Sequence, residues 1–369
     1  MICPSDRRDR RNPMRLGRKR KENTKRRRDG TAFRRIVLLG TLFLCTLGLY
    51  AQQRVAPLNP KEKVVVAYVP IMKFATLYVA AGRGLFEKYG LDVQIQSVKS
   101  GTEVIAFMTQ GKVDVGGIAI VASTWNAWAK GMDLKIVAPG ALEPIKGSPT
   151  NLLVRKDLVD SGKVKTVADL KGMKVAMAGG PGSGGEYLAT KALERGNLTI
   201  RDVQIVSLSN TDMPAALQNK SIDAGILGSP YADQAIEKGA AVPLAEDLTP
   251  GAMTVTFVAS GKFLKERPEA AKRFVLALME AARLMQGKDY LLPENMKAYL
   301  KYVNTTEEAI RKGEPVIYDP NMEIALDSLK DVERVHRENR RTEYTQPIDL
   351  KAVTDTSLVE WARSVLGRI

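Results

Sequence analysis

The sequence predicts an α/β protein made of two α/β units, in each of which strands alternate with helices. Short runs rich in Val and Ile recur from Lys63 onward, and helical stretches lie between them. Nearly continuous β-branched runs are typical of strands that a parallel sheet buries on both faces. The same alternation starts again at Asn151. We therefore expect βαβ units with right-handed crossovers in both halves of the chain.

The first α/β unit opens with Lys63-Val-Val-Val-Ala-Tyr-Val-Pro70, which predicts its first strand. A helix is expected at 77–89, because Gly90 suits a helix C-terminus. The following elements are expected in the order strand, helix, strand, helix and strand, at 91–98, 102–110, 113–120, 123–130 and 134–138.

The second unit repeats the pattern. A strand at 151–155 and a short helix at 167–172 precede a strand at 174–178, which runs into Gly179-Gly-Pro-Gly-Ser-Gly-Gly185. Helix and strand then alternate at 186–195, 203–208, 212–219, 224–227 and 230–238. A strand at 253–259 leads back out of this unit. Beyond Glu266 the chain is expected to be mainly amphipathic helix.

The net charge of +15 is concentrated at the N-terminus. Residues 1–51 hold 15 Lys and Arg side chains and four acidic ones, so the rest of the chain carries only +4. A basic groove is therefore not expected in the main part of the chain, and nucleic acid is not an expected partner. An uncharged apolar run at 36–49 follows the basic block and is shorter than the roughly 20 residues that cross a bilayer.

This order of segments predicts a secretory signal over 1–51, followed by a polar linker at 52–62. Ala51 offers a cleavage point, and an uncleaved membrane anchor stays an alternative. Cys3 and Cys45 both lie in the signal, so the exported chain is expected to have neither a disulfide nor a reactive thiol.

Several polar or flexible segments follow predicted strands and are candidates for a binding site. The glycine-rich turn after Ala178 leads into a helix, where free backbone N–H groups and the helix N-terminus favour an anion, although a plain turn is the alternative. Lys73 and Phe74 follow the first strand, at the sheet edge where α/β proteins bind ligands, but Lys73 could equally be a solvated charge. Ser100 could bind a ligand or cap a helix. Tyr231 could donate a hydrogen bond across a cleft.

Other residues are interpreted as structural. His336, the single histidine, lies in a very polar stretch and is expected to be a solvated helix position. Trp125 and Trp128 share a helix face and are expected to pack in the core. We find no His, Cys, Asp or Glu grouping at metal-ligand spacing, so we expect no metal, no cofactor and no catalytic triad.

Several stretches, in this order along the chain, resemble one family. They are Gly84-Leu-Phe-Glu-Lys-Tyr-Gly-Leu-Asp-Val93, Ser100-Gly-Thr102, Met108-Thr-Gln-Gly-Lys-Val-Asp114, Val167-Ala-Asp-Leu-Lys-Gly-Met-Lys-Val175, Ala215-Ala-Leu-Gln-Asn-Lys-Ser-Ile-Asp-Ala224 and Ser229-Pro-Tyr231. Together they resemble the periplasmic nitrate/sulfonate/taurine/bicarbonate-type binding proteins of ABC importers, which include thiamine-precursor-binding proteins. The resemblance covers about residues 63–290, and 349–367 resembles that family's closing segment.

The resemblance implies a type II periplasmic-binding-protein fold, in which two lobes with mixed sheets are joined by two crossover strands. Lobe 1 is then expected at 63–146 plus 254–369, with extra C-terminal helices, and lobe 2 at 147–253. It also implies a periplasmic, monomeric receptor that captures a small anionic solute by hinge closure and delivers it to a permease and its ATPase. The implied ligand contacts are Lys73, Phe74, Ser100, Gly101, Thr102, Gly182, Ser183, Ser229 and Tyr231.

Two alternatives to this receptor stay open. One is a membrane-anchored ligand sensor of the same fold that feeds no transporter. The other, less expected, is an enzyme, because the fold also includes a desulfinase and pyrimidine-precursor synthases. Those enzymes use catalytic Cys or His residues that the exported chain is not expected to supply.

Overall fold

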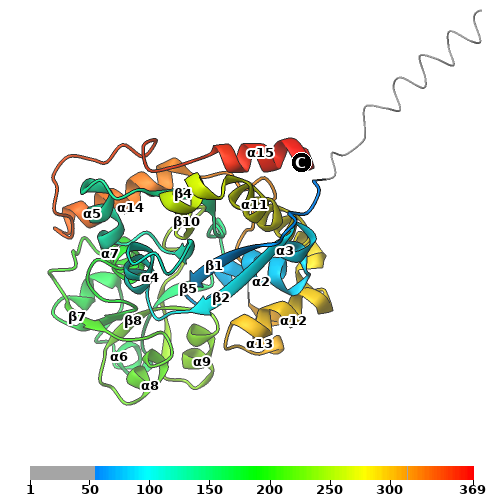
Figure 1. Ribbon diagram of the computed structural model, residues 1–369. Coiled ribbons are helices and arrows are strands. Elements are labelled where there is room, and N and C mark those ends of the chain that lie inside the picture. The colour runs from blue at the N-terminus through cyan, green and yellow to red at the C-terminus, as the bar shows by residue number, and fades with distance from the viewer. Residues whose placement is uncertain (1–54, 314) are drawn as a thin grey trace, which may run out of the picture. The chain divides into compact units, whose positions relative to one another are not determined.

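The computed structural model describes residues 55–313 and 315–369. The predicted signal at 1–51 and the first residues of the predicted linker lie outside the described residues. The described chain forms two five-stranded sheets with helices around them, which confirms the predicted α/β class (Figure 1). We call the first sheet with its helices lobe 1 and the second sheet with its helices lobe 2. Within these residues, no helix is both long enough and apolar enough to span a membrane.

The sheet of lobe 1 has the strand order β2-β1-β3-β10-β4. Its strands are β1 (Glu62–Tyr68), β2 (Leu91–Ser97), β3 (Val115–Ile118), β4 (Leu134–Pro139) and β10 (Thr256–Ser260). The pairs β1–β2 and β1–β3 are parallel, whereas β10 is antiparallel to both of its neighbours. The sheet is therefore mixed, because its fourth strand enters only after the chain has passed through lobe 2.

Helices cover both faces of this sheet. Side chains alternate along a strand, so Val64 and Val66 of β1 join one hydrophobic cluster and Ala67 joins another. The helices in contact with lobe 1 are α2 (Ala75–Gly82), α3 (Leu85–Lys88), α4 (Gly101–Thr109), α5 (Ala122–Ala129), α10 (Gly261–Glu266), α11 (Pro268–Arg283), α12 (Pro293–Tyr302) and α15 (Ser357–Leu366). The single helix predicted at 77–89 is wrong, because Gly84 adopts a left-handed φ of 67° and separates α2 from α3.

Lobe 2 contains the sheet β7-β6-β8-β5-β9. Its strands are β5 (Thr150–Arg155), β6 (Lys174–Met177), β7 (Gln204–Ser207), β8 (Ala224–Gly228) and β9 (Ala241–Ala245), and its helices are α6 (Lys156–Asp160), the 3-10 helix η3 (Val167–Leu170), α7 (Gly184–Glu194), α8 (Met213–Gln218) and α9 (Tyr231–Glu237). The sequence did not predict β9. This strand contains Pro243 and lies at the edge of the sheet, where a proline is tolerated.

Two segments, 140–149 and 246–255, connect the lobes. They meet where Leu142 pairs with Met253, and Leu142 also pairs with Ile317 from the C-terminal part of the chain. The predicted lobe boundaries near 147 and 253 stay a prediction. The helix α14 (Leu326–Glu338) contacts both α5 of lobe 1 and α7 of lobe 2, and Figure 1 shows these three helices together.

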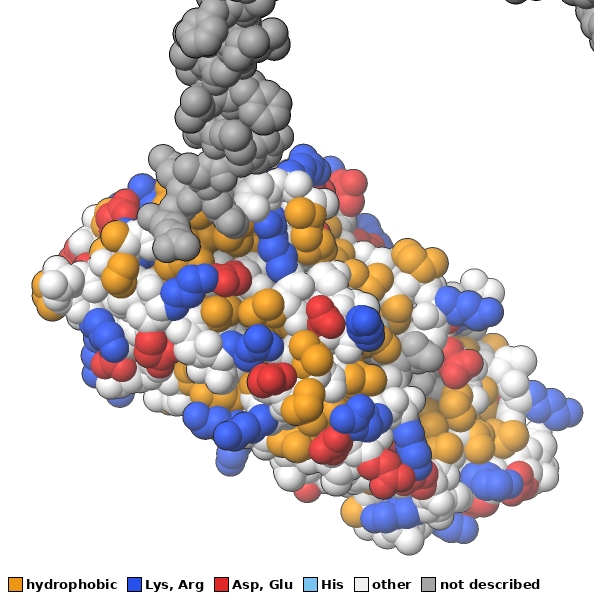
Figure 2. All heavy atoms as spheres, turned by 90° about the vertical axis from the view of Figure 1, so that its right-hand side faces the viewer, with side chains coloured by type: hydrophobic (Ala, Val, Ile, Leu, Met, Phe, Trp, Pro, Cys, Tyr) orange, Lys and Arg blue, Asp and Glu red, His pale blue; other side chains and the backbone are white. Residues whose placement is uncertain are grey.

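Surface charges of both signs are interspersed on the face shown in Figure 2. Elsewhere in the described residues, opposite charges form ion pairs such as Lys88 with Glu280 and Arg273 with Glu269. No block of one sign dominates this face, in keeping with the small net charge expected outside the N-terminal segment.

Candidate ligand-binding site

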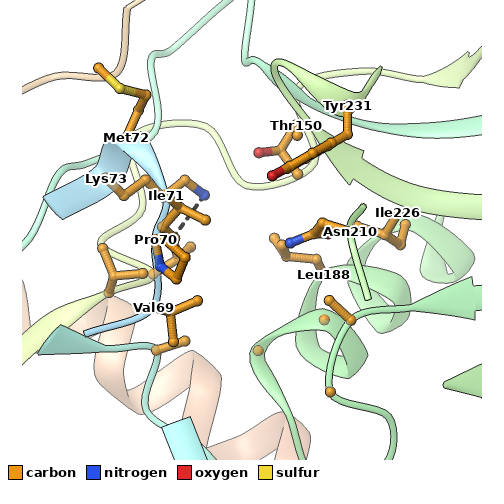
Figure 3. A pocket seen from close by; sticks show the side chains of 18 of the residues that line it. Val69, Pro70, Ile71, Met72, Lys73, Thr150, Leu188, Asn210, Ile226 and Tyr231 are labelled. Atoms are coloured by element: carbon orange, nitrogen blue, oxygen red, sulfur yellow. Dashed lines mark hydrogen bonds between the residues drawn. The ribbon is translucent and has the colours of Figure 1, made fainter. Parts of the chain in front are cut away.

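A cavity of about 450 Å³ lies between the two lobes. This volume falls in the range of small-molecule sites. Figure 3 shows the loop Val69–Lys73 on one side and Thr150, Leu188, Asn210, Ile226 and Tyr231 on the other. The cavity therefore has walls from both lobes, and closing or opening the lobes would change its size.

Eight of the nine predicted contact residues line this cavity. They are Lys73, Phe74, Ser100, Gly101, Thr102, Ser183, Ser229 and Tyr231. Gly182 is absent from the described lining, and both of its backbone groups have protein partners. Its N–H donates to Glu186 at 2.5 Å, and its carbonyl accepts from the N–H of Ala122 at 2.8 Å. Whether the other eight touch a ligand stays a prediction.

Lys73 is buried and forms an ion pair with Glu143. Its ammonium also lies 3.3 Å from the hydroxyl of Thr254, and the Ser148 hydroxyl donates to Glu143 at 2.8 Å. Glu143, Ser148 and Thr254 belong to the segments that connect the lobes. The alternative of a solvated Lys73 is therefore wrong, because a buried cation needs a charged partner and finds one there.

Phe74 serves the core beneath the cavity. Its side chain has no exposed surface, and its ring meets that of Phe257 edge to face at 5.5 Å between centroids. Trp125 and Trp128 are likewise buried, with ring centroids 5.1 Å apart, which confirms their predicted core position.

The N-terminus of α4 faces the cavity from lobe 1. Ser100 is its N-cap and accepts the N–H of Glu103 at 3.4 Å, so the capping alternative is realised. Gly101 and Thr102 occupy the first two helical positions and line the cavity. N–H groups at these positions have no acceptor within the helix, which leaves them available to a ligand.

The N-terminus of α7 faces the same cavity from lobe 2. Gly179, Gly180 and Gly182 adopt left-handed φ angles of 81°, 65° and 76°, so this turn depends on glycine. Ser183 caps α7 by accepting the N–H of Glu186 at 3.2 Å. Gly184 and Gly185, at the first two positions of α7, line the cavity and offer N–H groups like those of α4.

Part of the predicted anion cradle is filled by the protein itself. Glu186 has no exposed surface, and its carboxylate accepts the Gly182 N–H. Arg341 neutralises this carboxylate with N···O distances of 2.8 to 3.1 Å. The Gly182 N–H is therefore not available to an external anion, whereas Gly179, Gly184 and Gly185 line the cavity. The sequence hid this pairing, because Glu186 and Arg341 are far apart along the chain.

His336 is fully buried, so its predicted solvated position is wrong. The Trp125 indole donates to its Nδ1 at 3.1 Å, and its Nε2 lies 3.3 Å from the Ser183 carbonyl. Burial lowers the pKa of His336. His336 extends the buried stripe of α14 formed by Leu329, Val332 and Val335. The helical spacing of this stripe could have indicated that His336 points inward, despite the polar composition of the segment.

The hydroxyl of Tyr231 extends toward the opposite loop in Figure 3. Burial raises the pKa of this phenol, so it is a neutral donor at physiological pH. Sequence reasoning missed several other lining residues, among them Met72, Thr150, Leu188, Asn210 and Ile226. Of these, Met72 and Asn210 follow the ends of β1 and β7, which is the one signal that could have indicated them.

The charges at the described cavity wall are all basic. Lys73 is held by Glu143, and Lys99 is exposed at the rim. The lining includes no carboxylate among the residues that the structure describes. No group of His, Cys, Asp or Glu in this part of the chain is arranged to hold a metal ion. A small acid would thus meet N–H donors and Lys99 without an opposing negative charge.

Comparisons with known proteins agree with this architecture. Residues 58–301 match the model of the NMT1-like family. A putative aliphatic sulfonates-binding protein of Escherichia coli is 30% identical, over 56% of this chain and 62% of its own length. A 4-amino-5-hydroxymethyl-2-methylpyrimidine phosphate synthase of Saccharomyces cerevisiae is 26% identical, over 62% of this chain and 66% of its own length. The chain thus spans about three fifths of the first curated relative.

Solved structures show the same fold at low sequence identity. The ligand-binding component of an ABC-type import system from Staphylococcus aureus has a TM-score of 0.67 at 15% identity, covering 82% of this chain and 99% of its own. The alkanesulfonate-binding protein SsuA from Xanthomonas axonopodis pv. citri, bound to MOPS, has a TM-score of 0.64 at 18% identity, covering 80% and 98%. The desulfurization enzyme DSZB has a TM-score of 0.57 at 14% identity, covering 82% and 99%.

Proposed function

The chain belongs to the NMT1-like family, and on this premise we propose that it is the solute-binding receptor of an ABC importer. It captures a small organic anion between its lobes and delivers it to a permease. The sulfonate-binding relative and the import-system structure support this role. As the predicted signal implies, the protein acts in the periplasm.

One observation carries the proposal. The N-termini of α4 in lobe 1 and α7 in lobe 2 face one cavity, with Gly101 and Thr102 on one side and Gly184 and Gly185 on the other. Each N-terminus carries partial positive charge and unpaired N–H groups. An acidic group placed between them would bind both lobes at once. The ligand would therefore favour the closed arrangement over an open one, as hinge closure requires.

The connecting segments provide the hinge in this mechanism. Lys73 on the cavity loop is paired with Glu143 in one segment and lies near Thr254 in the other. This buried contact holds the loop after β1 against the hinge. Lobe 2 then rotates about 140–149 and 246–255, and the permease recognises the closed form.

The receptor role is favoured over catalysis by the side chains at the wall. An enzyme needs a nucleophile or a base beside its substrate. The described lining offers hydroxyls, one amide, backbone N–H groups and two lysines, of which Lys73 is committed to Glu143. The synthase and DSZB relatives keep an enzyme as the second candidate. Turnover of a bound sulfinate or pyrimidine substrate would favour that candidate.

Thermal unfolding with added ligands tests the receptor proposal. The panel contains alkanesulfonates, matching carboxylates, taurine, nitrate, aromatic acids and thiamine precursors. A ligand that binds only the native state stabilises it by about 2.7 kcal/mol at a hundredfold excess over Kd. We expect at least one organic acid to raise Tm. No shift with any member of the panel contradicts the proposal.

The membrane-anchored sensor differs only in the fate of the N-terminus. Mass spectrometry of the exported protein separates the two forms. An N-terminus near Gln52 supports a released receptor, and an intact presequence supports the anchored sensor.

A further inference from the structure

The cavity continues beyond the cleft between the lobes into the C-terminal part of the chain. We call this part of the cavity the tail chamber; its wall includes Tyr290, Val303, Ile310 and Val316. All four side chains are buried and belong to the hydrophobic cluster of lobe 1. Tyr290 lies in the 3-10 helix η4 (Gly287–Leu291), and Ile310 lies in α13 (Glu307–Lys312).

The tail chamber is apolar. Among the described residues of this part of the wall, Thr305 and Tyr290 are the polar ones, and none of the described residues there is charged. The ring of Tyr290 packs against Tyr299 and Tyr318, with centroids 5.3 and 6.2 Å away. Burial raises the pKa of Tyr290 to about 12, so its hydroxyl stays neutral.

The loop after β1 lines the same cavity and is held in place by hydrogen bonds to two of its carbonyls. The Tyr78 hydroxyl donates to the Ile71 carbonyl at 2.7 Å, and the Tyr318 hydroxyl donates to the Met72 carbonyl at 2.6 Å. With these carbonyls satisfied, the loop presents apolar side chains to the cavity. Met72 points away from Tyr231 in Figure 3, and its unbranched chain can adjust to a ligand that passes it.

Most of the chamber lies outside the residues that match the family. The match ends at residue 301, whereas Val303, Ile310 and Val316 follow it. Three of the four named chamber residues therefore come from the segment that follows the family match. Family membership alone says nothing about what it binds.

We propose that the tail chamber holds the apolar tail of the ligand whose acidic group lies between the N-termini of α4 and α7. The ligand is thus an amphiphilic organic acid with an extended apolar tail, and a small inorganic anion fills only one end of the cavity. This inference rests on the proposed receptor function. Continuity of the cavity from Gly101 and Gly184 to Ile310 and Val316 carries it.

Calorimetric titration of the exported protein with methane-, butane- and octanesulfonate, and with the matching carboxylates, tests the chamber. Each buried methylene is expected to tighten binding about fourfold until the chamber is full. The two series distinguish a sulfonate from a carboxylate head group. If these acids bind but their affinities do not change with tail length, the chamber proposal is overturned while the receptor proposal stands. If none of these acids binds, the chamber proposal is overturned, and the receptor proposal falls with it only when no other member of the wider ligand panel binds.

Two variants probe the chamber wall. Ile310→Trp fills the chamber, so we expect octanesulfonate to lose at least tenfold in affinity while methanesulfonate binding is unchanged. Ile310→Ala enlarges it, so the tail length of tightest binding should increase, and this variant keeps the test valid if the tryptophan disturbs folding. Leu300→Trp, at an exposed position of α12, is the control and should leave the whole series unchanged. Equal behaviour of the Ile310 variants and the control overturns the proposal.

Discussion

The guanidinium of Arg341 binds the fully buried carboxylate of Glu186, with its Nε 2.9 Å and a terminal nitrogen 2.8 Å from Oε1. Glu186 lies in the first turn of α7, and Arg341 follows α14. The pair therefore fixes the glycine-rich turn of lobe 2 to the C-terminal segment. The Glu186 carboxylate that Arg341 holds also accepts the Gly182 N–H, so this N–H is not available to a ligand.

Arg341→Ala should destabilise the protein by about 3 kcal/mol, because it leaves a buried carboxylate without a counter-ion. Urea denaturation measures this loss. Glu186→Gln removes the charge, so the double variant should recover a large part of the stability lost by Arg341→Ala. Simple addition of the two single effects would contradict the pairing described here.

Gly184→Ala should weaken ligand binding about tenfold, because an added Cβ would lie 2.7 Å from the Cβ of Ala119 in lobe 1. The lobes would then be held apart at this point. Ala119→Gly removes the obstructing atom, and the double variant should bind as tightly as the unaltered protein. If the double variant still binds the ligand weakly, the new methyl group affects the ligand itself and not the contact between the lobes.

His336 should make the stability of the protein depend on pH. Trp Nε1 can only donate, so the Trp125 contact requires a bare Nδ1 and a neutral ring that donates from Nε2 to Ser183. Desolvation holds the native pKa below the ordinary value of 6.5, with Glu186 and Glu333 opposing and Arg341 reinforcing this shift. The unfolded chain therefore binds the proton more readily than the native one.

His336 therefore stabilises the native protein more at neutral pH than at acidic pH. The contribution of His336 is complete above about pH 6.5 and is lost as the pH falls from there through the lowered native pKa, at up to about 1.4 kcal/mol per pH unit. Denaturation midpoints measured across this window should fall less in His336→Gln than in the unaltered protein. Identical pH profiles for the two proteins would count against a neutral buried histidine.

Lys73→Met should also destabilise the protein by about 3 kcal/mol, since Glu143 would remain buried without its cation. Combining it with Glu143→Gln should restore most of the loss. The restored double variant should still bind an organic acid, because the helix N-termini and not Lys73 supply the anion contacts. Loss of binding in that stable double variant would place Lys73 in direct contact with the ligand.

Local patterns predicted the strands well, because β-branched runs such as 63–70 have few alternatives to a buried strand. The positions of Ser100, Ser183 and Tyr231 at one cavity also followed from the rule that ligands bind at the ends of parallel strands. What the sequence could not reveal depends on pairs distant along the chain. Glu143 beside Lys73, Arg341 beside Glu186, and Trp125 beside His336 become neighbours only once the lobes and α14 are assembled.

The tail chamber escaped prediction for the same reason. Residues 303–316 carry no motif, and their apolar side chains are indistinguishable in sequence from ordinary core residues. The edge strand β9 was missed because Pro243 argues locally against a strand. Such features depend on tertiary context that a reading of local periodicity does not contain.

A proline exchange shows whether the N–H groups of the two opposed helices bind the acidic group of the ligand. Thr102→Pro deletes one of these N–H groups at the second position of α4, a position at which α8 already carries Pro214. Asp327→Pro makes the same exchange at the exposed second position of α14 and serves as the control. Calorimetry with butanesulfonate and butyrate measures the effect on whichever acid binds. Thr102→Pro should reduce the affinity for that acid tenfold or more, because a charge-assisted hydrogen bond contributes about 1.5–3 kcal/mol. The control should leave the affinity unchanged. Equal affinity in both variants would show that the Thr102 N–H does not hold the ligand.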